Sequence, residues 1–186
     1  QQAVRAAFGA ISQLWRGLTN AQRDAWNSAA GDFPYQNKLG DTRVLSGFAL
    51  HQKLNRNLQL AGQPAIASPP VPAAVPAPTV LSVDPSIATS LTMSGQFSVE
   101  MEPEATVIIF ATPPLSPGVN NYGNRLRFIT SAGQAEVQDG FKTLQAYAKT
   151  FGTPNAGAKI GYRIYAINPT TGQESAPLDA EIIVTA

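Results

Sequence analysis

Few side chains in this 186-residue sequence have the chemistry for catalysis or metal binding. There is one histidine, His51, and no cysteine, so neither an ordinary zinc site nor a Cys-His nucleophilic pair can be assembled. The G-x-S-x-G, P-loop and dinucleotide-binding glycine motifs are also absent. We therefore expect no enzymatic activity, no catalytic residue and no cofactor, and we interpret His51 as a partly exposed helix residue.

Three glutamates, Glu100, Glu102 and Glu104, follow one another at alternate positions along a strand pattern and the turn after it. Carboxylate oxygens are the ligands that Ca²⁺ prefers. The alternation also has a simpler explanation, because Glu100 and Glu102 are the outward neighbours of Val99 and Met101 in a half-buried strand. We favour this second interpretation and predict no metal site.

The charge pattern indicates protein partners. Only 13% of the residues are charged, against roughly 25% in a typical soluble domain, and the formal net charge is +1. No basic excess indicates nucleic acid, and no apolar run approaches the roughly 20 residues of a membrane-spanning helix. We therefore expect a protein that lies against neighbouring subunits, with no nucleic acid and no membrane insertion.

Residues 1–62 are expected to form a small helical region. Apolar residues recur at spacings of three and four over residues 4–18, which is typical of an amphipathic helix. Thr19 precedes Gln22 by three residues, the pattern of a capping box, so a second helix is expected over residues 20–30.

A third helix is expected over residues 46–61, with Ser46 as its N-cap. Three short helices bury little surface by themselves, yet this region is rich in large aromatic side chains. Such side chains either anchor helix packing or form an interface with another subunit. We take these aromatic residues as a candidate assembly interface: Phe8, Trp15, Trp26, Phe33, Tyr35 and Phe48.

The remaining chain is expected to be a proline-rich linker followed by a β domain. Residues 63–78 contain six prolines and no charge, which favours a semi-rigid extended backbone. Over residues 79–186 the apolar period changes to two, and turn signals separate seven or eight segments, the strand count of an antiparallel β-sandwich. The expected strands are residues 79–83, 91–101, 105–112, 125–130, 132–138, 143–151, 158–168 and 179–185. The fold class is thus α+β.

Residues 113–124 form the longest expected loop of this domain. Its composition suits contact with a partner, although an inert connection is the alternative interpretation. The residues chosen as a candidate recognition loop are Leu115, Val119, Asn120, Asn121 and Tyr122.

The C-terminal segment has the pattern of a strand, a turn and a second strand. A long strand pattern carries Tyr162, Ile164 and Ala166, a turn follows at residues 168–172, and Ser-Ala-Pro at residues 175–177 precedes the last strand. This resembles the final hairpin of fibronectin type III and related immunoglobulin-like modules. The resemblance implies the sandwich fold and little about function, because that scaffold serves many purposes.

A second resemblance covers the N-terminal third. The segments WRGLTNAQRDAW at residues 15–26, LSGF at 45–48 and AGQP at 61–64 look like virion proteins of tailed phages of Bacteroidota. The resemblance implies a virion structural protein, such as a capsid decoration, head-fibre or tail-associated subunit. Its partners would be other structural proteins in a multi-copy particle, with a host-surface glycan or protein as a possible ligand of the sandwich.

Two other functions stay open. One is a secreted bacterial adhesin or carbohydrate-binding module, located outside the cell or on its surface. The other is an accessory domain of an enzyme, which would need catalytic sequence outside these residues.

Overall fold

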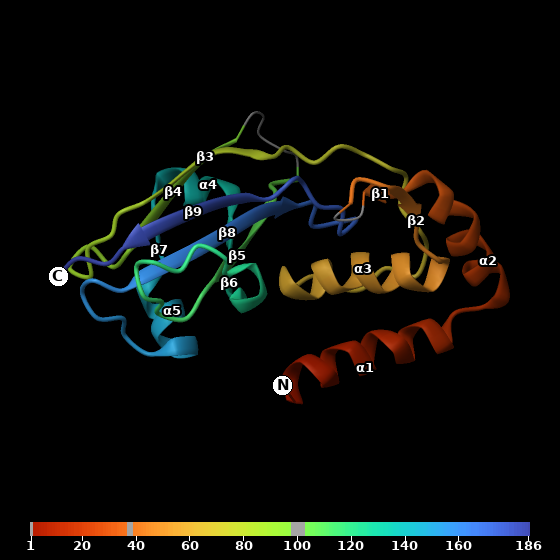
Figure 1. Cartoon of the computed structure of the whole chain (residues 1–186). Helices are drawn as coiled ribbons and strands as arrows, with labels where there is room; N and C mark the ends of the chain where they lie inside the picture. Colours follow the sequence, from red (N-terminus) through yellow and green to blue (C-terminus); the bar gives the residue numbers. More distant parts are fainter. Residues whose placement is uncertain (1, 37–38, 98–102) are drawn as a thin grey trace. The chain divides into compact units, whose positions relative to one another are not determined.

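The protein is a mixed α+β chain, described in a computed structural model over residues 2–36, 39–97 and 103–186 (Figure 1). Its sheets are antiparallel, and most strands lie in the C-terminal half. Within these residues no helix is long and apolar enough to cross a membrane. The chain divides into two compact units, Gln1–Ala74 with Pro169–Gln173, and Val75–Asn168 with Glu174–Ala186. We call them the helical unit and the strand unit.

The helical unit contains the three helices expected from the sequence: α1 (Gln2–Gly17), α2 (Asn20–Ala29) and α3 (Gly47–Leu60). Helix α2 begins with a complete capping box. The Thr19 hydroxyl accepts from the Gln22 amide at 3.2 Å, and the Gln22 side-chain oxygen accepts from the Thr19 amide at 2.9 Å. Both donors would otherwise be unpaired at the helix start.

A short connection separates α2 from α3. It comprises a 3₁₀ turn, η1 (Ala30–Asp32), and a small antiparallel hairpin of β1 (Pro34–Gln36) and β2 (Thr42–Val44). Ser46 then begins α3 as expected, because its hydroxyl accepts from the Ala49 amide at 3.2 Å.

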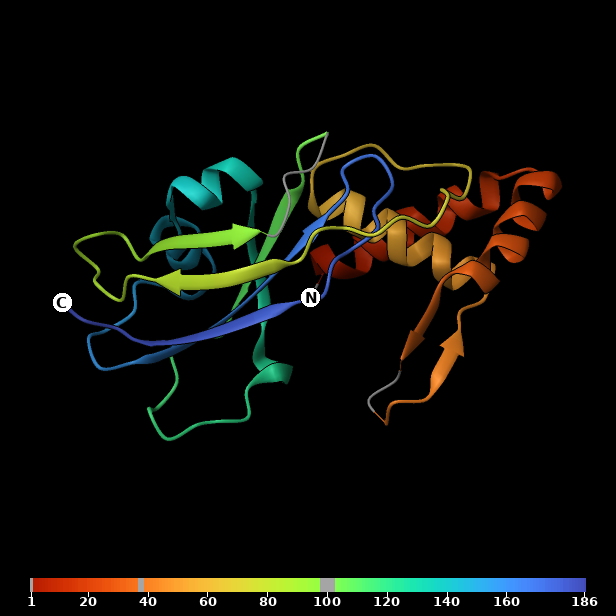
Figure 2. The same ribbon diagram turned by 90° about the horizontal axis from the view of Figure 1, so that it is seen from above.

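The strand unit contains two sheets, of three and four strands (Figure 2). The first has the order β3-β4-β7, and the second has the order β6-β5-β8-β9. Its buried core takes side chains from both sheets, including Met93, Val107, Ile109, Tyr162 and Ile164. The strands are β3 (Pro78–Val83), β4 (Thr92–Phe97), β5 (Thr106–Ala111), β6 (Arg127–Gly133), β7 (Phe141–Lys142), β8 (Lys159–Ile167) and β9 (Leu178–Ile183).

The prediction of a strand over residues 132–138 is wrong, because most of this segment forms helix α4 (Gln134–Asp139). The reason is a local capping arrangement. The Glu136 carboxylate accepts from the Gly133 amide at 3.0 Å, and the Glu104 carboxylate accepts from the Ala135 amide at 2.8 Å. Both bonds satisfy amides at the helix start.

The prediction of a strand over residues 143–151 is also wrong, because this segment forms helix α5 (Leu144–Phe151). Leu144, Tyr147 and Phe151 recur at spacings of three and four, which is the helical period. The Tyr147 ring is buried and lies 5.2 Å from the Phe151 ring. The helix thereby buries its apolar side in the core of the strand unit.

Candidate functional site

Four aromatic rings contact one another in the helical unit. The His51 ring lies edge-on against two tryptophan rings, at centroid distances of 5.3 Å from Trp15 and 5.1 Å from Trp26. Phe48 adds a third edge contact, 5.4 Å from Trp15. We call Trp15, Trp26, Phe48 and His51 the aromatic cluster.

The expectation that His51 is partly exposed is wrong, because its exposed fraction is only 1%. The sequence pattern places Leu50, Leu54 and Leu58 on the inner side of α3. His51 lies three residues before Leu54 and is therefore on a neighbouring row of the same inner side. The buried side of α3 is wider than its leucines indicate.

Burial also decides the charge of His51. Removing the imidazole from water disfavours its charged form and lowers its pKa below the usual 6.5. The neutral form of the ring therefore predominates at pH 7. Its Nδ1 atom is buried and has no hydrogen-bond partner among the described residues.

The proline-rich segment at residues 63–74 is tied to the helices by amide side chains, and we call it the strap. The Asn55 side chain accepts from the Ile66 amide at 2.7 Å and donates to the Ile66 carbonyl at 3.3 Å. The Gln173 side chain accepts from the Ala73 amide at 2.7 Å and donates to the Val71 carbonyl at 2.8 Å. Prolines have no amide hydrogen, so these side chains pair the donors and acceptors that remain.

The turn between β8 and β9 completes the helical unit. Residues Pro169–Gln173 belong to it. The Gly172 carbonyl accepts from the Asn57 side chain at 2.9 Å. Gly172 has φ of +73°, and a Cβ atom there would overlap the Leu54 carbonyl oxygen. Only glycine fits both the left-handed backbone and this close approach.

A groove of about 600 Å³ lies between α1 and the strap. None of its lining residues is Asp, Glu, Lys or Arg. Its apolar walls include Leu14, Leu18 and Ile66, and its polar lining groups include Gln13, Gln22 and His51.

The six candidate interface aromatics divide into two groups. Trp26 is fully buried, and its Nε1 atom donates to the Ala67 carbonyl at 2.9 Å. Trp15 and Phe33 are partly buried and pack against the same core. The remaining three are exposed: Phe8 by 43%, Tyr35 by 40% and Phe48 by 38%.

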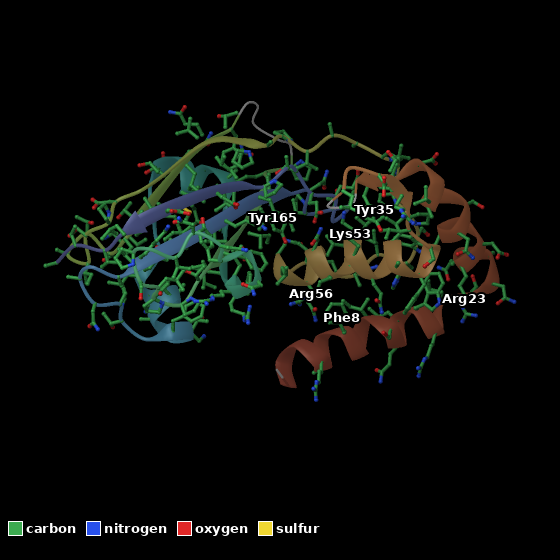
Figure 3. The ribbon with its side chains drawn as sticks, in the orientation of Figure 1. Phe8, Arg23, Tyr35, Lys53, Arg56 and Tyr165 are labelled. Carbon is green, nitrogen blue, oxygen red and sulfur yellow. The ribbon has the colours of Figure 1, made fainter. Side chains whose placement is uncertain are left out.

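The exposed aromatics of α1 and α3 lie along one line of contact between the two helices, which we call the α1–α3 seam. Arg56 lies over the Phe8 ring, 5.9 Å from its centroid, and Figure 3 shows both side chains. The Gln52 amide donates to the Ser12 hydroxyl at 2.9 Å. The Trp15–Phe48 contact follows one turn further on.

The candidate recognition loop is anchored on the four-stranded sheet by two of its members. Leu115 and Tyr122 are buried. The Tyr122 ring lies directly over Gly161, where a Cβ atom would overlap it. Val119 is half-buried, and Asn121 is exposed.

Polar contacts hold the same loop. Lys159 forms an ion pair with Glu181 at 2.5 Å, and its ammonium lies 3.3 Å from the Asn120 side-chain oxygen and 5.8 Å from the Tyr122 ring centroid. Burial and then a hydrogen bond to Glu181 raise the pKa of Tyr122 to about 12. Tyr122 thus fixes the loop on the sheet.

The glutamates considered for calcium are placed only in part. Glu104 caps α4, whereas Glu100 and Glu102 lie outside the described residues. Residues 2–36, 39–97 and 103–186 contain no group of three side chains suited to a metal ion.

Sequence reasoning missed the roles of Asn55 and Gln173. For Asn55 a signal was available, because an asparagine on the buried side of α3 needs hydrogen-bond partners and the proline-rich strap has few amide hydrogens. Gln173 lies 100 residues from Ala73 in sequence, and no local pattern connects the two. In comparisons with known proteins, no family model, curated protein or solved structure matches this chain.

Proposed function

We propose that this chain is a non-enzymatic structural subunit that docks onto other proteins through its helical unit. The observation that carries the proposal is the exposure of Phe8 and Phe48 at the two ends of the α1–α3 seam. Leu14, which is 47% exposed, adds a third large apolar side chain on α1. Fully burying a side chain of this kind contributes roughly 1.5–3 kcal/mol, so covering the exposed 38–47% of each contributes about 1 kcal/mol, and a partner that covers all three gains affinity.

The proposed setting is a virion, where the chain would be a capsid decoration, head-fibre or tail-associated subunit. Two features support this setting: the charged fraction of 13%, and the resemblance of the N-terminal third to virion proteins. The partners would be other structural proteins of the same particle, and many copies would be present.

The proposed fold of the strand unit is a β-sandwich of the fibronectin type III or immunoglobulin-like kind. Its division into sheets of three and four strands supports this, as does a core that draws on both sheets. The buried Tyr162 on the long strand β8 is a further supporting feature. In the proposed function this unit is displayed while the helical unit docks.

Mass spectrometry of purified particles tests the setting. We expect the chain at stoichiometric abundance in virions. Its absence from particles, with recovery from the culture medium or the cell surface, would reject the virion and favour the adhesin.

A pair of variants tests the docking surface. Phe8→Ser with Phe48→Ser should reduce incorporation into particles, because it removes apolar area from the α1–α3 seam. Val71→Ser is the matched control, since the Val71 side chain is also exposed and apolar but lies on the strap. Equal incorporation of the double variant and the control would count against docking through the seam.

One observation favours the second candidate, a carbohydrate-binding module. Phe110 stacks on Tyr165 at 5.9 Å and meets Phe128 edge-on at 6.0 Å. Phe110 pairs directly with Arg163, whose guanidinium forms two hydrogen bonds with Asp179 at 2.7 and 2.8 Å. Aromatic rings beside oriented polar groups suit a sugar ring, and a glycan array that detects no binding would dismiss this candidate.

A further inference from the structure

The lining and the volume of the groove beside α1 favour a neutral occupant of limited size. Its volume of about 600 Å³ falls within the range of roughly 300–1,000 Å³ that is typical of ligand pockets. Its lining contains no Asp, Glu, Lys or Arg side chain. A charged group placed there would lose water and meet no opposite charge, so an uncharged, mainly apolar group is favoured.

One lining residue, His51, indicates what polar group the occupant should carry. Its ring is neutral and 1% exposed, and Nδ1 has no partner among the described residues. Buried polar atoms without a partner are rare and unfavourable. A hydroxyl both donates and accepts, so it pairs with a neutral imidazole whichever nitrogen holds the proton.

The groove is formed before anything binds. Trp15 and Trp26 hold the His51 ring from two sides. Asn55 holds the strap at Ile66, and Trp26 holds it at Ala67. Binding to a site that is already ordered avoids the entropy cost of arranging it.

We infer that this groove receives a tyrosine side chain of a partner protein, with the ring against Leu14, Leu18 and Ile66 and the hydroxyl against His51. A phenylalanine would leave the imidazole unpaired, and a charged side chain would find no counter-charge. Leu14 lines the groove and is also 47% exposed. A polypeptide that inserts a tyrosine would cover this leucine as well. The inference rests on the proposed docking function and names the chemistry of one contact.

The test uses the full chain with two probes, p-cresol and toluene, which differ by the hydroxyl alone. Binding is followed by NMR chemical shifts of the amides at Leu14, Ile66 and His51. We expect p-cresol to bind about tenfold more tightly than toluene, the factor that one hydrogen bond of ordinary strength supplies. His51→Phe should make the two affinities equal, whereas Ser28→Ala, at an exposed position of α2, should leave the difference unchanged.

A second measurement needs no variant. The ring-nitrogen resonances of His51 should shift when p-cresol binds and stay fixed when toluene binds. The inference fails if neither probe shifts the groove amides, if p-cresol binds no more tightly than toluene, or if the imidazole resonances do not respond. Binding of p-cresol together with normal incorporation of the seam variant would reject docking through the seam while supporting the groove as a tyrosine site.

Discussion

Replacing Gly172 by alanine should strongly destabilise the helical unit. The left-handed backbone at φ of +73° costs an alanine roughly 1 kcal/mol. The new Cβ atom would also overlap the Leu54 carbonyl oxygen, so the turn must move away from α3. That movement breaks the bond from Asn57 and the two bonds of Gln173, each contributing about 1 kcal/mol. The expected loss is about 4 kcal/mol.

Gly62→Ala is the matched control, because Gly62 has φ of +70° and a Cβ atom there would meet nothing within 4 Å. It should cost only the backbone contribution of about 1 kcal/mol. Urea unfolding followed by tryptophan fluorescence measures both variants, since the chain has two tryptophans and both lie in the aromatic cluster. Equal losses for the two variants, within about 0.5 kcal/mol, would show that the turn does not pack on α3 in solution.

Three further outcomes are expected. Burial lowers the pKa of His51, so the imidazole is protonated at a higher pH in the unfolded chain than in the folded chain. The helical unit should therefore lose stability as the pH falls below about 6.5. His51→Gln should remove that slope in tryptophan-detected unfolding, and an unchanged slope would assign it to other groups. Gly161→Ala should lower the melting temperature, because the new Cβ atom displaces the Tyr122 ring. Gly118→Ala is the control, since a Cβ atom at Gly118 would meet nothing within 4 Å. Similar melting temperatures of the two variants would mean that the Tyr122 ring does not rest on the sheet. EDTA should leave the melting temperature unchanged, and a large fall would indicate calcium at the glutamates of residues 100–104.

Local signals make the helices of the helical unit predictable. The Thr19–Gln22 box and Ser46 define helix starts within a few residues of chain, and the structure has both caps. The segment at residues 143–151 is harder to predict, because only three apolar residues carry its helical spacing and the segments before it have strand patterns. The mixed α+β class was therefore predictable, whereas the two helices at Gln134–Asp139 and Leu144–Phe151 were predicted as strands.

The candidate site was predictable only in its aromatic part. Trp15, Trp26 and Phe48 stand out by their size and by their place on helices. The groove does not, because its second wall comes from the strap, whose position depends on Asn55. Sequence spacing describes one element at a time, and the contacts of Gln173 with the strap join residues about 100 positions apart.

The place of residues 169–173 in the helical unit has a consequence for the order in which the chain matures on a ribosome. The three helices and the strap are synthesised before the strand unit, yet their last contacts form only with Gln173. At about 5–20 residues per second, the 94 residues of Val75–Asn168 delay these contacts by about 5–20 s. During that interval most of the strand unit emerges. The helices and the strap are thus made before most of the strand unit, yet their contacts with Gln173 can form only after it.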